Sequence, residues 1–393
     1  MRYENRLHNI AAKPNLQCPT LFVLSSPKQR HNPAIMSSTF LHSLREYILQ
    51  SSHINSAIVF AVIATMLASV AWLADSISPS NTGRSSETAA STHQDSADTY
   101  EPSVLDVLIV KAMLNKSLLL PPEIVDNIVD QAEYWPHTTA EFTSNGDYSI
   151  RGGSHGSENE LLLRSVPLGF PRWPPRERTE SHHPPVLPKP VGDEFPADTF
   201  QELIASPVPT LAHPCRKIVF TIKSRDQGWG GERQHHGTYN GSWTWFEAGL
   251  ERWSRSENYN EAEPDPSSVA RPSLNPADLS PVYPIVEFDS DSNQNSLRHT
   301  TLPSEEHKIQ CNVTALRELK EHRVVWCYTN EDDETNEAAA VALAEKGRGR
   351  ATGDGKFVRD LRLGDVVTVW GMARFPAWVN YVRSVKIDVY WAV

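Results

Sequence analysis

Cysteine is scarce in this chain. The 393 residues include four, Cys18, Cys215, Cys311 and Cys327, and their separations do not match the short spacing of zinc ligands. Three of them lie in the C-terminal region, so that region can close at most one disulfide. We therefore interpret the cysteines as small buried or free thiols and expect neither a metal nor another cofactor. Cysteine usage of this kind assigns the protein to no compartment.

Basic residues are also fewer than acidic ones. The chain has 37 Lys and Arg against 48 Asp and Glu, a net charge of -11, whereas a protein that binds nucleic acid shows a basic face. Gly347–Gly355 lacks the Gly-Lys-Ser/Thr ending of a phosphate loop. In His182-His183 and in His235-His236, the two neighbouring side chains face opposite sides of an extended chain, so neither pair is expected to bind one metal ion. We expect no nucleic-acid partner.

Long apolar runs are absent, with one exception. Ala57–Ala74, AIVFAVIATMLASVAWLA, is eighteen residues without a charge. As a helix it would rise about 27 Å, close to the roughly 30 Å of a bilayer core. Basic residues are scattered through the tail 1–56, and acidic residues follow in 75–102, a Ser- and Thr-rich stretch that predicts a disordered linker. The positive-inside rule then predicts a single-pass membrane protein with a cytoplasmic N-terminus.

Two other interpretations of the first hundred residues remain open. A secretory signal would use Ser69-Val70-Ala71 for cleavage, but the apolar run begins deep in the chain unless synthesis starts at Met36. In the other interpretation, residues 1–100 are a leader that lies outside the folded protein. In these cases the protein is secreted or cytosolic.

Residues 103–137 predict a helical hairpin. Apolar residues in Val104–Met113 recur at helical spacing. A second helix begins at Leu120-Pro121-Pro122-Glu123, because proline suits the first turn and Glu suits the positive helix end. Its apolar stripe needs a partner surface, most simply the C-terminal domain of the same chain. Residues 138–214 are rich in proline and predict an extended linker, in which Leu161–Leu163 docks on that domain.

Aromatic residues gather in 215–393, which holds eight of the eleven Trp. The closing segment Val385–Trp391 alternates apolar and polar residues, as a half-buried strand does. Residues 254–304 are acidic and proline-rich and predict a disordered insertion. We expect a mainly β fold, an antiparallel β-sandwich of the jelly-roll or galactose-binding-like type. Its other predicted elements are strands at Ile218–Ile222, Ile309–Thr314, His322–Tyr328 and Val366–Trp370, and a helix at Glu337–Glu345. Within Gly237–Gly249 an Asn240-Gly241 turn is expected to lead into a strand with Trp243 and Trp245 on one face.

Several long motifs in this region resemble a known family. They are LPPEIVDNIVDQAEYWPH (120–137), RKIVFTIKSRDQGWGG (216–231), GTYNGSWTWFEAGLER (237–252), RATGDGKFVRDLRLGDVVTVWGMARFPAWVN (350–380) and VKIDVYWAV (385–393). Together they resemble a family of uncharacterised filamentous-fungal proteins to which no activity is assigned. The resemblance covers roughly residues 103–393.

A looser likeness concerns the hairpin. Leu120–Ile124, followed by Ile128 and Val129, resembles the opening of an F-box, the helical module that docks substrate receptors onto cullin ubiquitin ligases. The sequence departs from that pattern after Trp135, where the rest of a three-helix F-box is not evident. The β domain is similar in outline to galactose-binding-like sandwiches, some of which follow F-boxes and bind sugars or protein ends. These likenesses imply a second function, a cytosolic F-box-like substrate adaptor.

A third hypothesis is a glycoside-type hydrolase, which needs two carboxylates facing one cleft. Asp226, Glu247, Asp354 and Asp365 are the candidates, but each lies beside a turn glycine or a strand end, where carboxylates commonly cap backbone N–H groups. We therefore expect no catalytic residues.

A ligand surface is the stronger expectation. Exposed tryptophan beside polar side chains suits sugar or peptide recognition, because the ring stacks while the polar groups fix orientation. Trp243 and Trp245 could equally be core residues of a strand, whereas Trp229, between glycines, is the one most expected to be exposed. We predict a non-enzymatic, membrane-anchored binding protein that recognises a carbohydrate or protein ligand. The candidate ligand-binding residues are Arg225, Asp226, Gln227, Trp229, Trp243 and Trp245.

Overall fold

The computed structural model describes residues 101–153, 157–173, 188–193, 195, 200, 204, 212–254, 278–290, 293–331 and 336–393. The predicted basic tail, the predicted membrane helix Ala57–Ala74 and nearly all of the linker that follows it lie outside these residues. Within the described part of the chain, no helix is both long and apolar enough to span a membrane.

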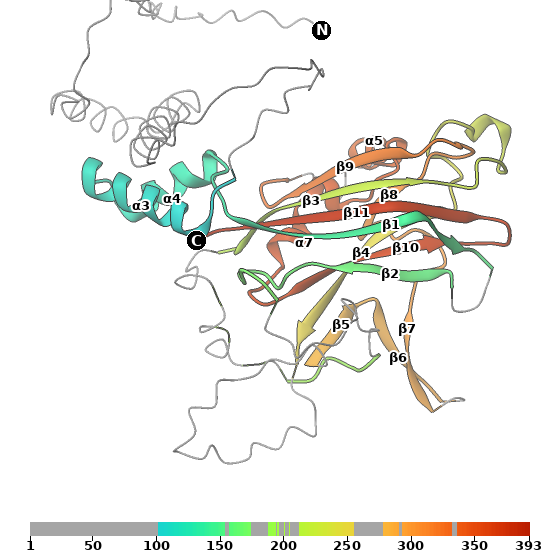
Figure 1. Cartoon of the computed structure of the whole chain (residues 1–393), viewed down its shortest axis with the longest axis horizontal. Helices are drawn as coiled ribbons and strands as arrows, with labels where there is room; N and C mark the ends of the chain where they lie inside the picture. The colour runs from blue at the N-terminus through green and yellow to red at the C-terminus, as the bar shows by residue number, and fades with distance from the viewer. Residues whose placement is uncertain are drawn as a thin grey trace, which may run out of the picture. The chain divides into compact units, whose positions relative to one another are not determined.

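Two antiparallel sheets form most of the described fold (Figure 1). The first sheet has the strand order β1 (His137–Arg151), β11 (Val379–Trp391), β3 (Cys215–Arg225) and β9 (Lys320–Cys327). The second has the order β2 (Asn159–Arg164), β10 (Val366–Ala373), β4 (Thr244–Trp253) and β5 (Leu279–Tyr283), and β8 (Lys308–Cys311) also pairs with β4. A separate hairpin joins β6 (Ile285–Asp289) to β7 (Gln294–Arg298).

The two sheets share one hydrophobic core. Phe220 of β3 and Val385 of β11 belong to the same buried cluster as Phe246 of β4 and Val369 of β10, and none of these four side chains has any exposed surface. In β11 the buried residues Val385, Ile387 and Val389 alternate with more polar neighbours, as the sequence predicted. The prediction of a mainly β, antiparallel fold is therefore confirmed.

Two parts of the sequence prediction were wrong. The predicted linker 138–214 contains β1 and β2, which form one edge of each sheet. The apolar residues of β1 are few: Ala140 and Phe142 are half-buried against the core, and Ile150 is its one fully buried side chain, as suits an edge strand with a solvated face. The predicted insertion 254–304 contains β5, β6 and β7. Residues 255–277 of that insertion lie outside the described residues.

The helices between β9 and β10 are short. α5 (Glu337–Glu345) has the bounds that the sequence predicted and begins after Asn336, whose side chain accepts a hydrogen bond from the Ala339 backbone N–H. α6 (Ala351–Asp354) and α7 (Lys356–Arg359) follow α5 along the chain. Gly355 separates them with a φ of 64°, a conformation that suits glycine.

The helical hairpin lies where the sequence placed it. α3 (Val104–Leu118) begins with a capping box between Ser103 and Asp106, which satisfies two N-terminal N–H groups. α4 (Pro122–Gln131) begins with proline in its first turn, as predicted. β1 follows α4 almost directly, starting at His137, so the residues after Trp135 enter a sheet instead of completing a three-helix F-box.

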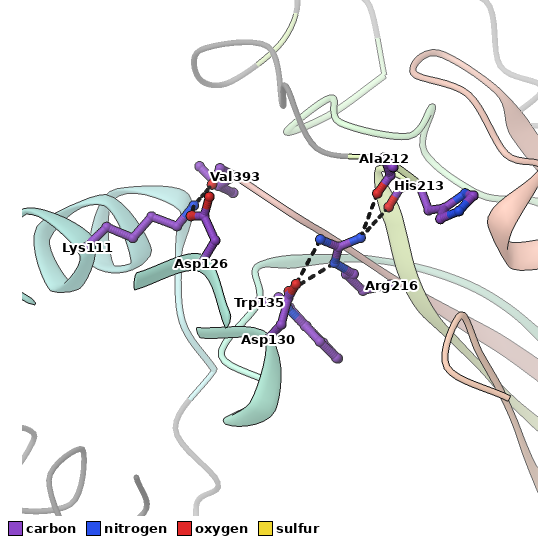
Figure 2. Close-up of polar contacts among 8 residues, drawn as sticks. All are labelled: Lys111, Asp126, Asp130, Trp135, Ala212, His213, Arg216 and Val393. Carbon is purple, nitrogen blue, oxygen red and sulfur yellow. Dashed lines mark hydrogen bonds and ion pairs between the residues drawn. The ribbon is translucent and has the colours of Figure 1, made fainter. Parts of the chain in front are cut away.

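The hairpin packs on the β domain of its own chain, as expected. Val129 and Trp135 form a buried cluster that reaches Tyr328 and Tyr390. Figure 2 shows the polar side of this contact, in which the buried Arg216 guanidinium donates two hydrogen bonds of 2.9 Å to the Asp130 carboxylate. Trp135 Nε1 donates to the same carboxylate at 2.8 Å.

Arg216 is held from several sides. Its remaining Nη donates to the backbone oxygens of Ala212 and His213, and its guanidinium lies 4.5 Å from the centre of the Tyr328 ring. A second ion pair joins Lys111 of α3 to Asp126 of α4 at 2.7 Å (Figure 2). Lys111 also donates to the backbone oxygen of Val393. The hairpin is therefore fixed to the sheets by a buried, charge-assisted contact.

We predict that Asp130→Asn lowers the free energy of unfolding by about 3 kcal/mol, because it leaves a buried guanidinium without its carboxylate. The matched control is Glu133→Gln. Glu133 follows α4 on the hairpin, is 57% exposed and pairs with Lys217 of β3, so the loss of its charge costs less than about 1 kcal/mol. Denaturant unfolding of the three proteins measures the difference, and equal effects of the two substitutions would contradict the assignment.

Two histidines, the half-buried His299 and the buried His322, are uncharged at neutral pH. Burial lowers the pKa of His299 to about 4, and the charge of Arg374 acts in the same direction. Burial likewise lowers the pKa of His322 to about 4, with Lys320 and Arg348 adding to the effect. His299 lies edge to face with Trp370, and His322 Nε2 lies 3.0 Å from the Tyr239 hydroxyl.

The sign of the resulting pH dependence follows from proton binding. Below the ordinary pKa of 6.5 the unfolded chain binds protons at these histidines, while the folded chain does not until the pH nears 4. Stability is therefore full above pH 6.5 and falls between pH 6.5 and 4. At pH 5 each histidine costs about 2 kcal/mol relative to pH 7.5. Urea unfolding at pH 7.5 and pH 5 measures this loss of stability. His299→Phe is expected to reduce the loss by about 2 kcal/mol, the contribution of one histidine. An unchanged loss in that variant would refute the assignment.

Candidate ligand-binding site

Four loops meet at the end of the sheets opposite the helical hairpin. They follow β1, β3, β8 and β10, and we call them the aromatic loop end, consisting of residues 152–153, 226–243, 312–319 and 374–378. Backbone hydrogen bonds of 2.9 Å tie them together: Gly152 N–H donates to Trp378 O, Arg374 N–H to Trp243 O, and Gly237 N–H to Thr314 O. The loop end is therefore one connected surface.

A buried polar network lies beneath this surface. Asn312 donates from Nδ2 to Thr244 Oγ1 and Asn380 Oδ1, and its Oδ1 accepts from the Ser224 hydroxyl at 2.7 Å. Asn380 Nδ2 lies within 3.2 to 3.3 Å of the backbone oxygens of Trp245 and Met372. Both side chains are almost fully buried. The network joins β3 and β11 of one sheet to β4 and β10 of the other and fixes the roots of the loops.

Asp226 and Gln227 hold the first loop in place. Asp226 is fully buried, and its carboxylate accepts from the backbone N–H groups of Gly228 at 2.7 Å and Ala315 at 2.6 Å. Burial raises the pKa of Asp226, while these backbone donors act in the opposite direction. Gln227 Oε1 accepts from the Val379 N–H, and its Nε2 donates to the Trp229 backbone oxygen. Both side chains position the loop; Asp226 has no surface for a ligand, contrary to its predicted role.

Arg225 lies beside this loop. Its guanidinium pairs with Asp147 of β1 at 3.0 Å and lies 4.2 Å from the centre of the Tyr381 ring. Toward its neighbour Asp226 it donates to the backbone oxygen, at 3.3 Å. The side chain is partly exposed, at the border of the aromatic loop end.

The three tryptophans of the prediction have different surroundings. Trp229 is 57% exposed, as predicted, and its neighbours Gly228 and Gly230 have φ angles of 78° and 95° that only glycine adopts readily. Trp243 is half-buried. Trp245 is fully buried, and its indole N–H donates to Glu247 at 2.7 Å, so its predicted contact with a ligand is wrong. Trp245 occupies a paired position of β4, whose residues here are buried on both faces.

Phe375 belongs to this surface and was not predicted. It is 45% exposed, and its ring lies edge to face with Trp243 at 4.6 Å. Its φ of 65° is unusual for a bulky residue and turns the loop sharply before Pro376. Trp378 packs against Gly231, where a Cβ would lie 3.6 Å from the ring. The Phe-Pro step after the apolar run Val366–Trp370 was the available signal in the sequence.

The candidate catalytic carboxylates do not converge. Glu247 is fully buried and accepts from Trp245 Nε1, the Ser304 N–H and the Tyr283 hydroxyl. Asp365 is buried and pairs with Arg252 through two hydrogen bonds. Asp354 lines two cavities, and Glu247 and Asp365 line neither of them. The four candidate carboxylates therefore form no pair across one of these cavities, which does not favour the predicted glycoside hydrolysis by them.

The described cysteines are free thiols. Cys215 and Cys311 are buried, Cys327 is half-buried, and no disulfide joins them. Burial raises the pKa of Cys311 to about 11, which makes it a poor nucleophile at neutral pH. Among the described residues there is no cluster of three His, Cys, Asp or Glu side chains that could hold a metal ion.

Two cavities lie away from the aromatic loop end. One, of about 510 Å³, is an open groove lined by His213, Tyr328 and Arg359 among others. The other, of about 360 Å³, is lined by Tyr283, His307 and Phe357 among others. None of the predicted ligand-binding residues lines either cavity.

Comparison with protein-family models, curated proteins and solved structures found no match. The resemblance to the filamentous-fungal family therefore stays a prediction.

Proposed function

We propose that this protein is a non-enzymatic binding protein, anchored to a membrane through Ala57–Ala74, which uses the aromatic loop end of a jelly-roll or galactose-binding-like sandwich to bind a carbohydrate or protein ligand. The observation that supports it best is the exposure of two large aromatic side chains, Trp229 at 57% and Phe375 at 45%, on loops fixed by buried hydrogen bonds. Rigid aromatic anchors bind at low cost in conformational entropy.

The path of the chain suits this function. The segment before α3 enters at the hairpin end, and β1 then runs fifteen residues to the opposite end, where Gly152 begins the aromatic loop end. A strand of this length spans roughly 50 Å. The aromatic loop end therefore lies at the end of the domain opposite the helical hairpin.

The binding surface is tested with Trp229→Ala and Phe375→Ala in the full-length chain. Glycan and peptide arrays identify a ligand, and titration then measures its affinity, which we expect to fall about tenfold in either variant. The control is Phe288→Ala, because Phe288 is 63% exposed on β6, outside the aromatic loop end. Thermal unfolding checks that all variants are folded. Unchanged affinity in both test variants would exclude this surface.

Membrane orientation is tested by protease protection of the C-terminal domain in intact microsomes. We expect protection, together with a glycan at the exposed sequon Asn240. Asn312 is a poor reporter because its side chain is buried in the polar network. Digestion of the domain without glycosylation, with cullin-ligase subunits co-purifying, would refute the proposed orientation in favour of the F-box-like adaptor.

A further inference from the structure

The 360 Å³ cavity lies at a break in the edge of the second sheet. β8 pairs with Trp245–Glu247 of β4, and β5 pairs with the same strand only from Leu250 onward. α6 and α7 pass beside the gap and supply Ala351 and Phe357 to its lining. We call this space the β5–β8 cavity. Its volume is within the range of small-ligand pockets, about 300–1,000 Å³.

Three aromatic rings face the β5–β8 cavity. The centres of Tyr283 and His307 are 3.9 Å apart, and Phe357 lies edge to face with His307 at 5.8 Å. The Tyr283 hydroxyl is fixed by a 2.8 Å hydrogen bond to the buried Glu247 carboxylate. Leu250, Val282 and Ile285 complete an apolar wall. Val282 and Ile285 are 36% and 56% exposed, so apolar surface continues to the mouth.

The charges around the β5–β8 cavity favour a cation. Glu306, Asp354 and Asp360 line it together with two basic residues, Arg350 and Lys356. Arg350 pairs with Glu305 at 3.3 Å, outside the lining. Among the described residues, neither Glu306 nor Asp360 has an ion pair.

The charged groups around the β5–β8 cavity also act on the pKa of His307. Burial lowers its pKa, so the ring is neutral at pH 7 and does not repel a cation. Glu306, Glu247 and Asp354 act on that pKa in the opposite direction to burial, and Lys356 acts with it. Three carboxylates and one ammonium group therefore act on the His307 ring, and their summed electrostatic potential there is negative.

We propose that the β5–β8 cavity binds a small organic cation with an apolar body, of the alkylammonium class. Its methyl or methylene groups pack on the faces of Tyr283 and Phe357, where cation–π attraction stabilises the charge. Glu306 and Asp360 lie close enough to the same space to attract the positive head group. This site is separate from the aromatic loop end and does not depend on the ligand proposed there.

The test uses a pair of probes that differ in charge and hardly in shape: choline and its neutral isostere 3,3-dimethylbutan-1-ol. Calorimetric titration of the full-length chain is expected to show saturable binding of choline, about tenfold tighter than that of the isostere. The affinity for choline should fall with ionic strength, and the affinity for the isostere should not.

Substitutions locate the site. Phe357→Leu removes a ring but keeps apolar volume, and Glu306→Gln removes an exposed charge without touching the core; each should weaken choline binding about fivefold. Phe288→Leu on β6 and Trp229→Ala in the aromatic loop end should leave it unchanged. If Phe357→Leu impairs folding, Glu306→Gln still decides. The proposal is overturned by absence of saturable choline binding, by equal affinity for the neutral isostere, or by full affinity in Glu306→Gln.

Discussion

The buried polar network centred on Asn312 and Asn380 is the constraint on which the rest of the β domain depends. Side-chain amides in a core are stable only when their donors and acceptors are paired, and here they bond across the two sheets. A slip of one residue in any contributing strand would leave these groups unpaired. The network therefore sets the relative position of the sheets, and through it the spacing of the loops that carry Trp229 and Phe375.

The opposite end of the domain is fixed by a different kind of contact. Arg216 joins α4 to β3 through Asp130 and also closes the segment before β3 through Ala212 and His213. Its planar guanidinium suits this task, because it can pair with a carboxylate, donate to carbonyls and stack on Tyr328 at the same time. The helical hairpin is therefore part of the same folded unit as the sheets, unlike a module that folds and docks separately.

Sequence patterns predicted the central elements better than the edges. β11 and α5 were predictable because period two in Val385–Trp391 and the capping residue Asn336 are local signals. β1 was missed because its polar residues face water and its partner, β11, lies more than two hundred residues away. Trp229 could be placed on the surface from its flanking glycines. Trp245 could not be assigned, since a strand residue reveals its burial only when the second sheet is known. The β5–β8 cavity was unpredictable for the same reason: it arises from two strands sharing one edge of β4.

The position of Asn312 has a consequence for biosynthesis. Its sequon is accessible on the nascent chain but sealed between the sheets once β8, β3 and β11 have assembled. An oligosaccharide attached there during translocation would keep the sheets from closing. In a glycosylating compartment, assembly of this junction would therefore compete with the transferase for Asn312.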